Sequence, residues 1–224
     1  MIRRDYILRM IEEFIQALSR IRALKKEQLW PEAAMSLDEE FQRLVGGGAR
    51  AVAGLTQTEL IARLIRGEPT QVVHTKTLLL TTLLLEAGDL AALQERPGES
   101  RSCYLKGLHL LLYSLAAGEV HEMPEFVPKI EVFATCLQES PLPLETNAML
   151  MQHYERTGEF AKAEDALFAM LEAEPKNPRL LEFGIAFYRR LELQSDASLE
   201  AGNLPRTEVE AGLADLRRRD AGTD

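Results

Sequence analysis

The chain has 224 residues, of which 46% are hydrophobic and 27% charged, so it can bury a core and is neither disordered nor collagenous. Leucine occurs 37 times and alanine 26 times, whereas valine and isoleucine together occur only 17 times. This excess of good helix formers over β-branched residues predicts an all-α protein. The formal net charge of -9 argues against a nucleic-acid partner, because binding to phosphates requires a positive surface.

The N-terminal segment is basic, unlike the rest of the chain. Residues 1–26 contain seven basic and three acidic side chains, and the spacing of their apolar residues predicts one amphipathic helix from about Arg4 to Gln28. Its apolar stripe consists of Ile7, Met10, Ile11, Phe14, Leu18 and Ile21. We consider three interpretations of this stripe, in this order: it packs into the protein's own core, forms the seam of a homodimer, or lies on an anionic membrane surface.

Other sequence features predict a cytoplasmic protein without a transmembrane segment. Charged Arg9, Glu12 and Glu13 interrupt the apolar residues near the start, which is not typical of a secretory signal. No uncharged apolar run reaches the roughly 18 residues that span a bilayer. The two cysteines, Cys103 and Cys136, are too few for a disulfide framework and are not clustered like metal ligands, so we interpret them as reduced thiols.

The middle of the chain predicts helices that are separated by glycine and proline. Thr56 and Glu59 have the spacing of a capping box, in which each side chain bonds the other residue's backbone N–H at the start of a helix. Pro97-Gly98 separates two long helices that are apolar on more than one face and therefore belong in the interior. The expected helical ranges are 31–44, 56–66, 73–93, 100–117 and 124–139, the last with an irregularity at Pro128.

The C-terminal part contains a repeat. Shifting the sequence by 34 residues places Tyr154 on Tyr188 and Ala163 on Ala197. This period and the large and small residues within it resemble the tetratricopeptide repeat. The matching positions are Leu150, Tyr154, Gly158, Ala163, Leu167 and Pro175, and the departures from the family's preferences are Asn147, Met151 and Met170.

The resemblance implies an all-α fold of antiparallel helix pairs, stacked as a tetratricopeptide-like right-handed α-solenoid with about nine to eleven helices. Gly158 should divide one pair, and Gly202 and Pro205 should interrupt the helix that follows the second copy. We expect an N-terminal helical region, residues 1–70, and a helical-repeat region, residues 71–224, joined in one continuous structural unit.

Two further segments resemble an uncharacterised bacterial family whose C-terminal helices are tetratricopeptide-like. They are Asp5-Tyr-Ile-Leu-Arg-Met-Ile-Glu12 and Cys103-Tyr-Leu-Lys-Gly-Leu-His-Leu-Leu111, in the first half of the chain. The family has no assigned activity. The resemblance therefore implies membership and supplies no catalytic residues.

The residue types that carry chemistry form no recognisable motif. None of the four histidines lies three or four residues from another, so no two share a helix face as metal ligands. His121 with Glu122 and Glu125 comes nearest to a ligand cluster, but we interpret these residues as solvated loop charges. No nucleophile elbow occurs. The sequence therefore predicts no enzyme, no cofactor and no metal.

A stack of helix pairs forms a concave surface that can bind a partner's peptide or helix. The repeat resemblance implies that the first helix of each pair lines this groove. The predicted partner-binding residues are Gln152, Glu155, Arg156, Arg179, Arg189 and Arg190. The three arginines near one another suit an acidic protein partner, because guanidinium groups bind carboxylates through paired donors. Two alternatives stay open: these are ordinary solvated charges, or the protein is a membrane-surface adaptor that binds through its N-terminal helix.

Overall fold

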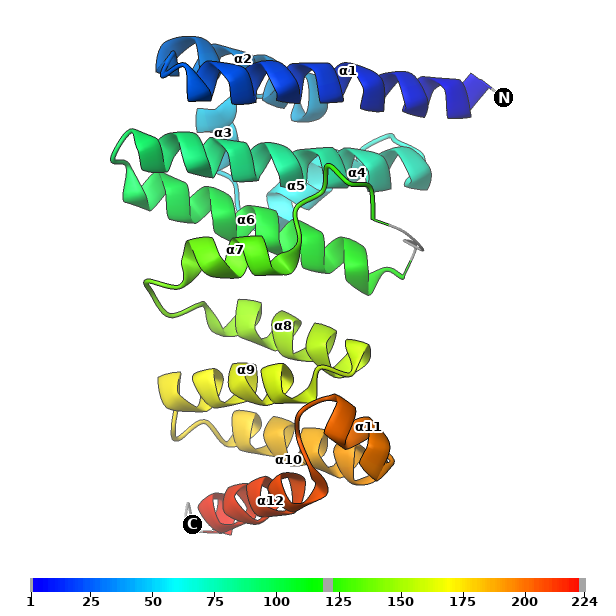
Figure 1. Ribbon diagram of the computed structural model, residues 1–224, viewed down its shortest axis with the longest axis vertical. Helices are drawn as coiled ribbons and strands as arrows, with labels where there is room; N and C mark the ends of the chain where they lie inside the picture. Colours follow the sequence, from blue (N-terminus) through cyan, green and yellow to red (C-terminus); the bar gives the residue numbers. More distant parts are fainter. Residues whose placement is uncertain (1, 119–122, 222–224) are drawn as a thin grey trace. The chain divides into compact units, whose positions relative to one another are not determined.

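The computed structural model describes residues 2–118 and 123–221, with side chains from residue 5 onward. These residues form twelve helices and no strand (Figure 1). The all-α prediction is confirmed, whereas the expected number of helices was too low. One reason is the five-residue helix α3, which sequence patterns did not indicate: the Asp38 carboxylate accepts the Ala49 N–H at 2.6 Å and so supports a single helical turn between two glycines.

Contacts divide the chain into two compact units, which are described separately: unit 1 comprises residues 1–140 and unit 2 residues 141–224. The helices of unit 1 are α1 (Ile2–Lys26), α2 (Trp30–Val45), α3 (Ala49–Ala53), α4 (Gln57–Ile65), α5 (Thr70–Leu93), α6 (Pro97–Ala116) and α7 (Ile130–Leu137). Those of unit 2 are α8 (Leu144–Thr157), α9 (Phe160–Ala173), α10 (Pro178–Glu192), α11 (Asp196–Ala201) and α12 (Arg206–Ala221). Within unit 1, helices α1, α2 and α4 all contact α5, so packing crosses residue 70.

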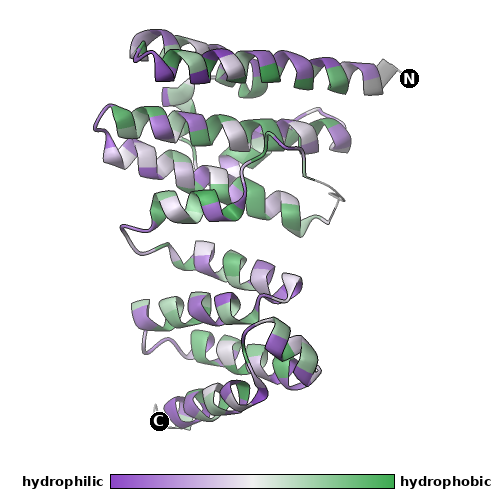
Figure 2. Cartoon of the chain, in the orientation of Figure 1, coloured by the Kyte–Doolittle hydropathy of each residue, from purple (hydrophilic) through white to green (hydrophobic). Residues whose placement is uncertain are grey.

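The core of unit 1 is built around the α5–α6 pair. Most of α5 is hydrophobic along its length, as Figure 2 shows, and the successive residues Leu78, Leu79 and Leu80 are all buried although each lies about 100° around the helix from the one before. A helix that is apolar on several faces requires neighbours on several sides, and α5 has them in α1, α2, α4 and α6. The predicted interior position of both long helices is thus confirmed.

The amphipathic helix α1 packs its apolar stripe into this core. Phe14 and Ile21 are completely buried, and the cluster that contains them includes leucines of α2 and α5. The first of the three interpretations is therefore confirmed. Tyr6, Leu8 and Ile15 stay exposed on α1, so a homodimer seam or a membrane contact would have to use these residues and not the buried stripe.

Local sequence signals explain several helix ends. The capping box at α4 is present: the Thr56 N–H bonds Glu59 Oε2 at 2.8 Å and the Glu59 N–H bonds Thr56 Oγ1 at 3.2 Å. The helix expected over residues 124–139 is shorter than predicted, since α7 begins only at Ile130. Pro128 accounts for this difference, because it lacks an N–H and disfavours helical geometry at the residue before it.

Unit 2 consists of the α8–α9 pair followed by α10, which packs mainly on α12. Gly158 ends α8 with φ of 79°, a left-handed conformation that glycine adopts without strain, and α9 starts directly after it. Helix α8 begins at Leu144 and α10 at Pro178, in keeping with the 34-residue period. The correspondence does not extend from α9 to α11. Ala163 is buried in α9, whereas Ala197, which lies 34 residues later, is exposed in the short α11.

Tyr188 of α10 is fully buried and carries a polar contact to α9. Its hydroxyl donates a hydrogen bond to Glu164 Oε1 of α9, and its ring fills the space left by Gly212 of α12, where a Cβ would come within 2.4 Å of the phenol ring. Burial raises the pKa of the Glu164 carboxyl, and nearby Glu208 adds to the effect, although the Tyr188 hydrogen bond opposes it.

We expect unit 2 to lose stability as the pH rises from about 4.3, the ordinary glutamate pKa, through the raised pKa of Glu164. Over this window the folded state binds more protons than the unfolded state, so stability falls with increasing pH. Glu164→Gln cannot titrate and should remove this part of the pH dependence. Urea unfolding followed by circular dichroism at a series of pH values measures the effect. Glu210→Gln, at an exposed position of α12, is the control for the change of charge. Identical pH profiles for the wild type and Glu164→Gln would contradict the prediction.

Candidate functional site

Helix α10 carries a stripe of side chains in which two arginines flank an apolar centre. Arg179, Phe183, Ala186 and Arg190 follow one another at intervals of four, three and four residues, which places them on one face of the helix. Phe183 and Ala186 are half-buried, and both arginines are exposed. We call this set the α10 stripe. It can offer an apolar contact and guanidinium donors to the same ligand.

The α10 stripe is tied to α8 by an ion pair. The Arg190 guanidinium binds the Glu155 carboxylate with two hydrogen bonds, Nε to Oε1 at 2.6 Å and Nη2 to Oε2 at 2.8 Å. The hydrogen bond to Glu155 raises the pKa of the Arg190 guanidinium above its ordinary value. Such a bidentate pair fixes the orientation of both side chains. Helices α8 and α10 therefore contribute to one surface of unit 2.

The predicted partner-binding residues do not all lie together in the structure. The structure brings Glu155 and Arg190 together, which sequence spacing alone did not indicate. Gln152 and Arg156 are exposed on α8, one turn apart. Arg189 is exposed on α10 but lies about 100° around the helix from Arg190, beside the α10 stripe. Among the described residues, neither Arg179 nor Arg189 has a carboxylate within ion-pair distance.

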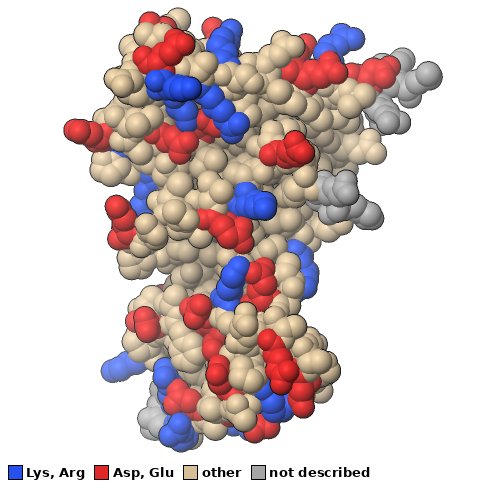
Figure 3. Space-filling view, in the orientation of Figure 1, with Lys and Arg blue, Asp and Glu red and all other residues tan. Residues whose placement is uncertain are grey.

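Sequence reasoning missed the apolar centre of the stripe, Phe183 and Ala186. A spacing of four and three residues from Arg179 could have indicated them, because it places all three side chains on one helix face. Figure 3 shows acidic and basic side chains interspersed over the visible face of each unit. Exposed charge alone therefore does not set the α10 stripe apart. Its distinguishing feature is the apolar centre between two arginines.

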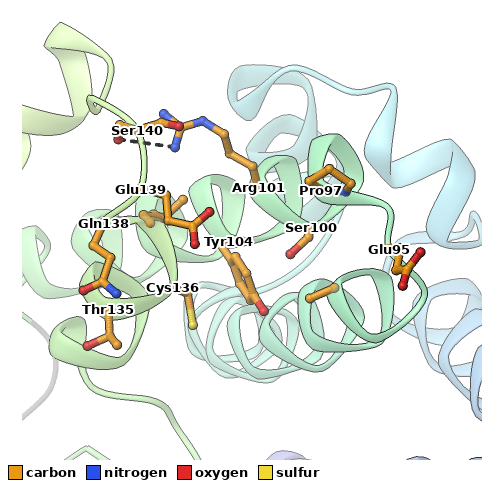
Figure 4. Close-up of a pocket in the computed structure, with 12 residues that line it drawn as sticks. Glu95, Pro97, Ser100, Arg101, Tyr104, Thr135, Cys136, Gln138, Glu139 and Ser140 are labelled. Carbon is orange, nitrogen blue, oxygen red and sulfur yellow. Dashed lines mark hydrogen bonds between the residues drawn. The ribbon is translucent and has the colours of Figure 1, made fainter.

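Unit 1 contains a pocket of about 630 Å³ between the end of α5, the first half of α6 and the residues of and after α7 (Figure 4). Tyr104 and Cys136 meet in its wall, and the Arg101 guanidinium donates to the Ser140 carbonyl oxygen at 3.5 Å. Burial raises the pKa of the Tyr104 phenol and of the Cys136 thiol. Both groups therefore stay protonated at neutral pH, which is unsuitable for a nucleophile or a general base.

A network of charges connects this pocket to α1. The Tyr104 hydroxyl donates to Asp89 Oδ1 at 2.9 Å, and Lys25 Nζ of α1 bonds Asp89 Oδ2 at 3.0 Å. Lys25 also pairs with Glu86, which is almost fully buried and which Arg22 Nε contacts at 2.6 Å. These five residues come from α1, α5 and α6. All five have opposite-charge or hydrogen-bonding partners, as buried ionic groups require.

The described residues contain no group of three or more histidine, cysteine, aspartate and glutamate side chains that could hold a metal ion. His121 and Glu122 of the cluster considered above lie outside the described residues. Both cysteines are free thiols. In the part of the chain that the structure covers, no helix combines the length and the apolar character needed to cross a membrane.

A family model matches residues 1–220, and it is described as a family of unknown function (DUF6483). The match spans both units, whereas the segments that resembled an uncharacterised family in the sequence lie in unit 1 alone. No curated protein and no solved structure matches the chain.

Proposed function

We propose that this chain, which belongs to the family of unknown function DUF6483, is a protein-interaction module that binds an acidic segment of a partner protein on unit 2. The observation that carries the proposal is the α10 stripe, an apolar centre between two arginines, held to α8 through the Glu155–Arg190 pair. Two arginines are free to bind partner carboxylates, because they have no ion pair within the described structure: Arg179 at the start of the stripe, and Arg189, which lies beside the stripe next to Arg190.

The architecture of unit 2 supports a tetratricopeptide-like assignment within this proposal. The α8–α9 pair, the 34-residue spacing of α8 and α10, and the glycine turn at Gly158 fit that repeat. In a right-handed solenoid of this kind the first helices of successive repeats line one groove. A cytoplasmic scaffold is the corresponding cellular role, and the two free cysteines fit a reducing compartment.

The alternative role as a membrane-surface adaptor has less support. It relies on the apolar stripe of α1, and the central residues of that stripe are buried in the core of unit 1. A helix that binds a membrane surface needs its apolar face free.

We expect Arg179→Glu combined with Arg189→Glu to weaken binding of an acidic peptide with a central leucine by about tenfold or more, because two attractive contacts become repulsive. Fluorescence anisotropy with the labelled peptide measures the affinity. The wild-type affinity should fall as salt is raised, since the contacts are exposed. Phe183→Ala should weaken binding by a factor that depends little on salt, because it removes only the apolar contact.

The matched control combines Lys176→Glu with Arg217→Glu, which changes the net charge equally at two exposed positions of unit 2 outside the α10 stripe. It should retain the wild-type affinity. Equal weakening by both double variants would indicate attraction by net charge alone. Unchanged binding of the Arg179/Arg189 variant would exclude α10 as the binding surface.

A further inference from the structure

A second pocket of unit 1, separate from the proposed peptide surface, is lined mainly by small side chains. It has a volume of about 540 Å³ and lies between α2, α3, α5 and α6, which are labelled in Figure 1. Its apolar wall contains Leu37, Leu90, Cys103 and five alanines: Ala34, Ala49, Ala53, Ala87 and Ala91. The volume is many times the roughly 30 Å³ of one water molecule and falls in the range of small-molecule sites. The alanines therefore leave room for an aliphatic ligand.

The acidic side chains at this pocket are already bound within the protein. Asp38 accepts the Ala49 N–H at 2.6 Å, and Glu99 forms an ion pair with Arg96. Arg50, by contrast, is exposed at the pocket and has no ion pair with any described residue. Arg50 thus has neither an ion pair nor a side-chain hydrogen bond with any described residue, whereas Glu99 has a cationic partner and Asp38 has a backbone N–H.

Lys106 adds a second uncompensated positive charge behind the pocket wall. Its side chain belongs to a residue only 7% exposed, and its Nζ donates to the Ala53 carbonyl oxygen at 2.6 Å and to Ser102 Oγ at 2.9 Å. Both acceptors are neutral, and no carboxylate of the described residues lies within ion-pair distance. The third proton of the Lys106 ammonium group has no acceptor among the described residues. Burial lowers the pKa of Lys106, as expected of a cation without an anionic partner.

The contrast with Lys25 shows that this arrangement differs from the other buried lysine of unit 1. Lys25 is also largely buried, with 11% of its side chain exposed, and it binds two carboxylates, Glu86 and Asp89. Buried charges in proteins are normally paired. Because Arg96 and Glu99 pair with each other, the charges without an ion pair at this pocket are Asp38, Arg50 and Lys106, and their net charge of +1 favours a ligand that brings its own negative charge.

We propose that the pocket between α2, α3, α5 and α6 binds an aliphatic carboxylate, with its hydrocarbon chain against the alanines and its carboxylate near Arg50, in the positive potential to which Lys106 contributes. The apolar wall supplies the affinity for the chain through burial of methylene groups. The two cations supply the preference for a negative head group, because charge-assisted contacts in a partly buried site are stronger than in water. This site is independent of the peptide surface on unit 2.

Isothermal titration calorimetry of the full chain with octanoate, octanol and octylammonium tests the proposal. Octanoate should bind about tenfold more tightly than octanol, which has the same chain without the charge, and octylammonium should bind more weakly than either. Trp30, the single tryptophan, lies one turn before Ala34 on α2, so its emission provides a second readout of binding. Equal affinities for octanoate and octanol, or no binding of octanoate, would refute the proposal.

Three variants locate the site. Ala87→Phe should fill the pocket and abolish binding of octanoate and octanol alike. Arg50→Gln, an exposed change that leaves the core intact, should reduce octanoate binding several-fold without affecting octanol, whereas Arg66→Gln, exposed at the end of α4, should affect neither. Lys106→Met should also reduce the preference for octanoate over octanol relative to the wild type, provided that its circular dichroism spectrum matches the wild-type spectrum. Retention of the full preference in Arg50→Gln would exclude the assigned role of Arg50 and with it the proposed position of the carboxylate.

Discussion

Replacing Lys25 with methionine is expected to lower the free energy of unfolding of unit 1 by about 3 kcal/mol, the lower end of the range for a broken buried ion pair. Lys25 and Glu86 have side chains only 11% and 3% exposed, so the variant leaves a buried carboxylate with fewer partners. Arg22 still contacts Glu86 Oε1, which is why the loss should not reach the upper end. Denaturant unfolding followed by circular dichroism measures it.

Two comparisons separate this effect from a general loss of charge on α1. Arg20→Met removes the exposed pair with Glu39 and should change stability by less than about 1 kcal/mol. Lys25→Met combined with Glu86→Leu removes both buried charges and should recover most of the lost stability, because apolar residues can replace a buried pair. A double variant that is less stable than Lys25→Met would show that the buried carboxylate is not the cause of the loss.

Replacing Gly202 with valine is expected to destabilise unit 2 by about 3 kcal/mol, near the upper end for overpacking. A Cβ at this position would lie 2.4 Å from Phe160 Cδ2 and 2.5 Å from the Gly158 carbonyl oxygen. The backbone contact cannot be relieved by a rotamer change. Gly202 also accepts the Ala161 N–H at 3.0 Å, so any shift would strain the start of α9. Thermal unfolding by circular dichroism gives the change in stability.

Gly98 provides the matched control for this substitution. No atom lies within 4 Å of a Cβ built there, so Gly98→Ala should leave stability unchanged or raise it slightly. Gly202→Val with the wild-type melting temperature would mean that the α8–α9 turn and the α11–α12 junction do not pack as the structure shows.

Much of the fold follows from local patterns in the sequence. The capping box at Thr56 and Glu59, the glycine turn at Gly158 and the continuous apolar character of α5 were predictable, because each depends on neighbouring residues and simple periodicity. The same approach overestimated the length of α7. The Pro128 irregularity was recognised, but the pattern could not show that the helix begins only after it.

The candidate peptide surface was predictable only in part. Sequence spacing identified Arg179, Arg189 and Arg190 on one helix, but it treated Arg190 as free to bind a partner. The structure pairs Arg190 with Glu155, which lies 35 residues earlier in the chain. A contact of this kind depends on how α8 and α10 pack, and no local pattern encodes it.

The amino-acid sequence by itself determined the helical class, most helix ends and which face of α1 is buried, because propensity, capping and apolar periodicity act over a few residues. Only the tertiary structure decided which charges are compensated. Lys25 and Lys106 are both lysines on helices of unit 1, yet packing places one beside two carboxylates and the other beside a backbone carbonyl and a hydroxyl. The electrostatic energy of each depends on distances of a few ångströms between groups far apart in sequence, and these distances exist only once the helices have packed.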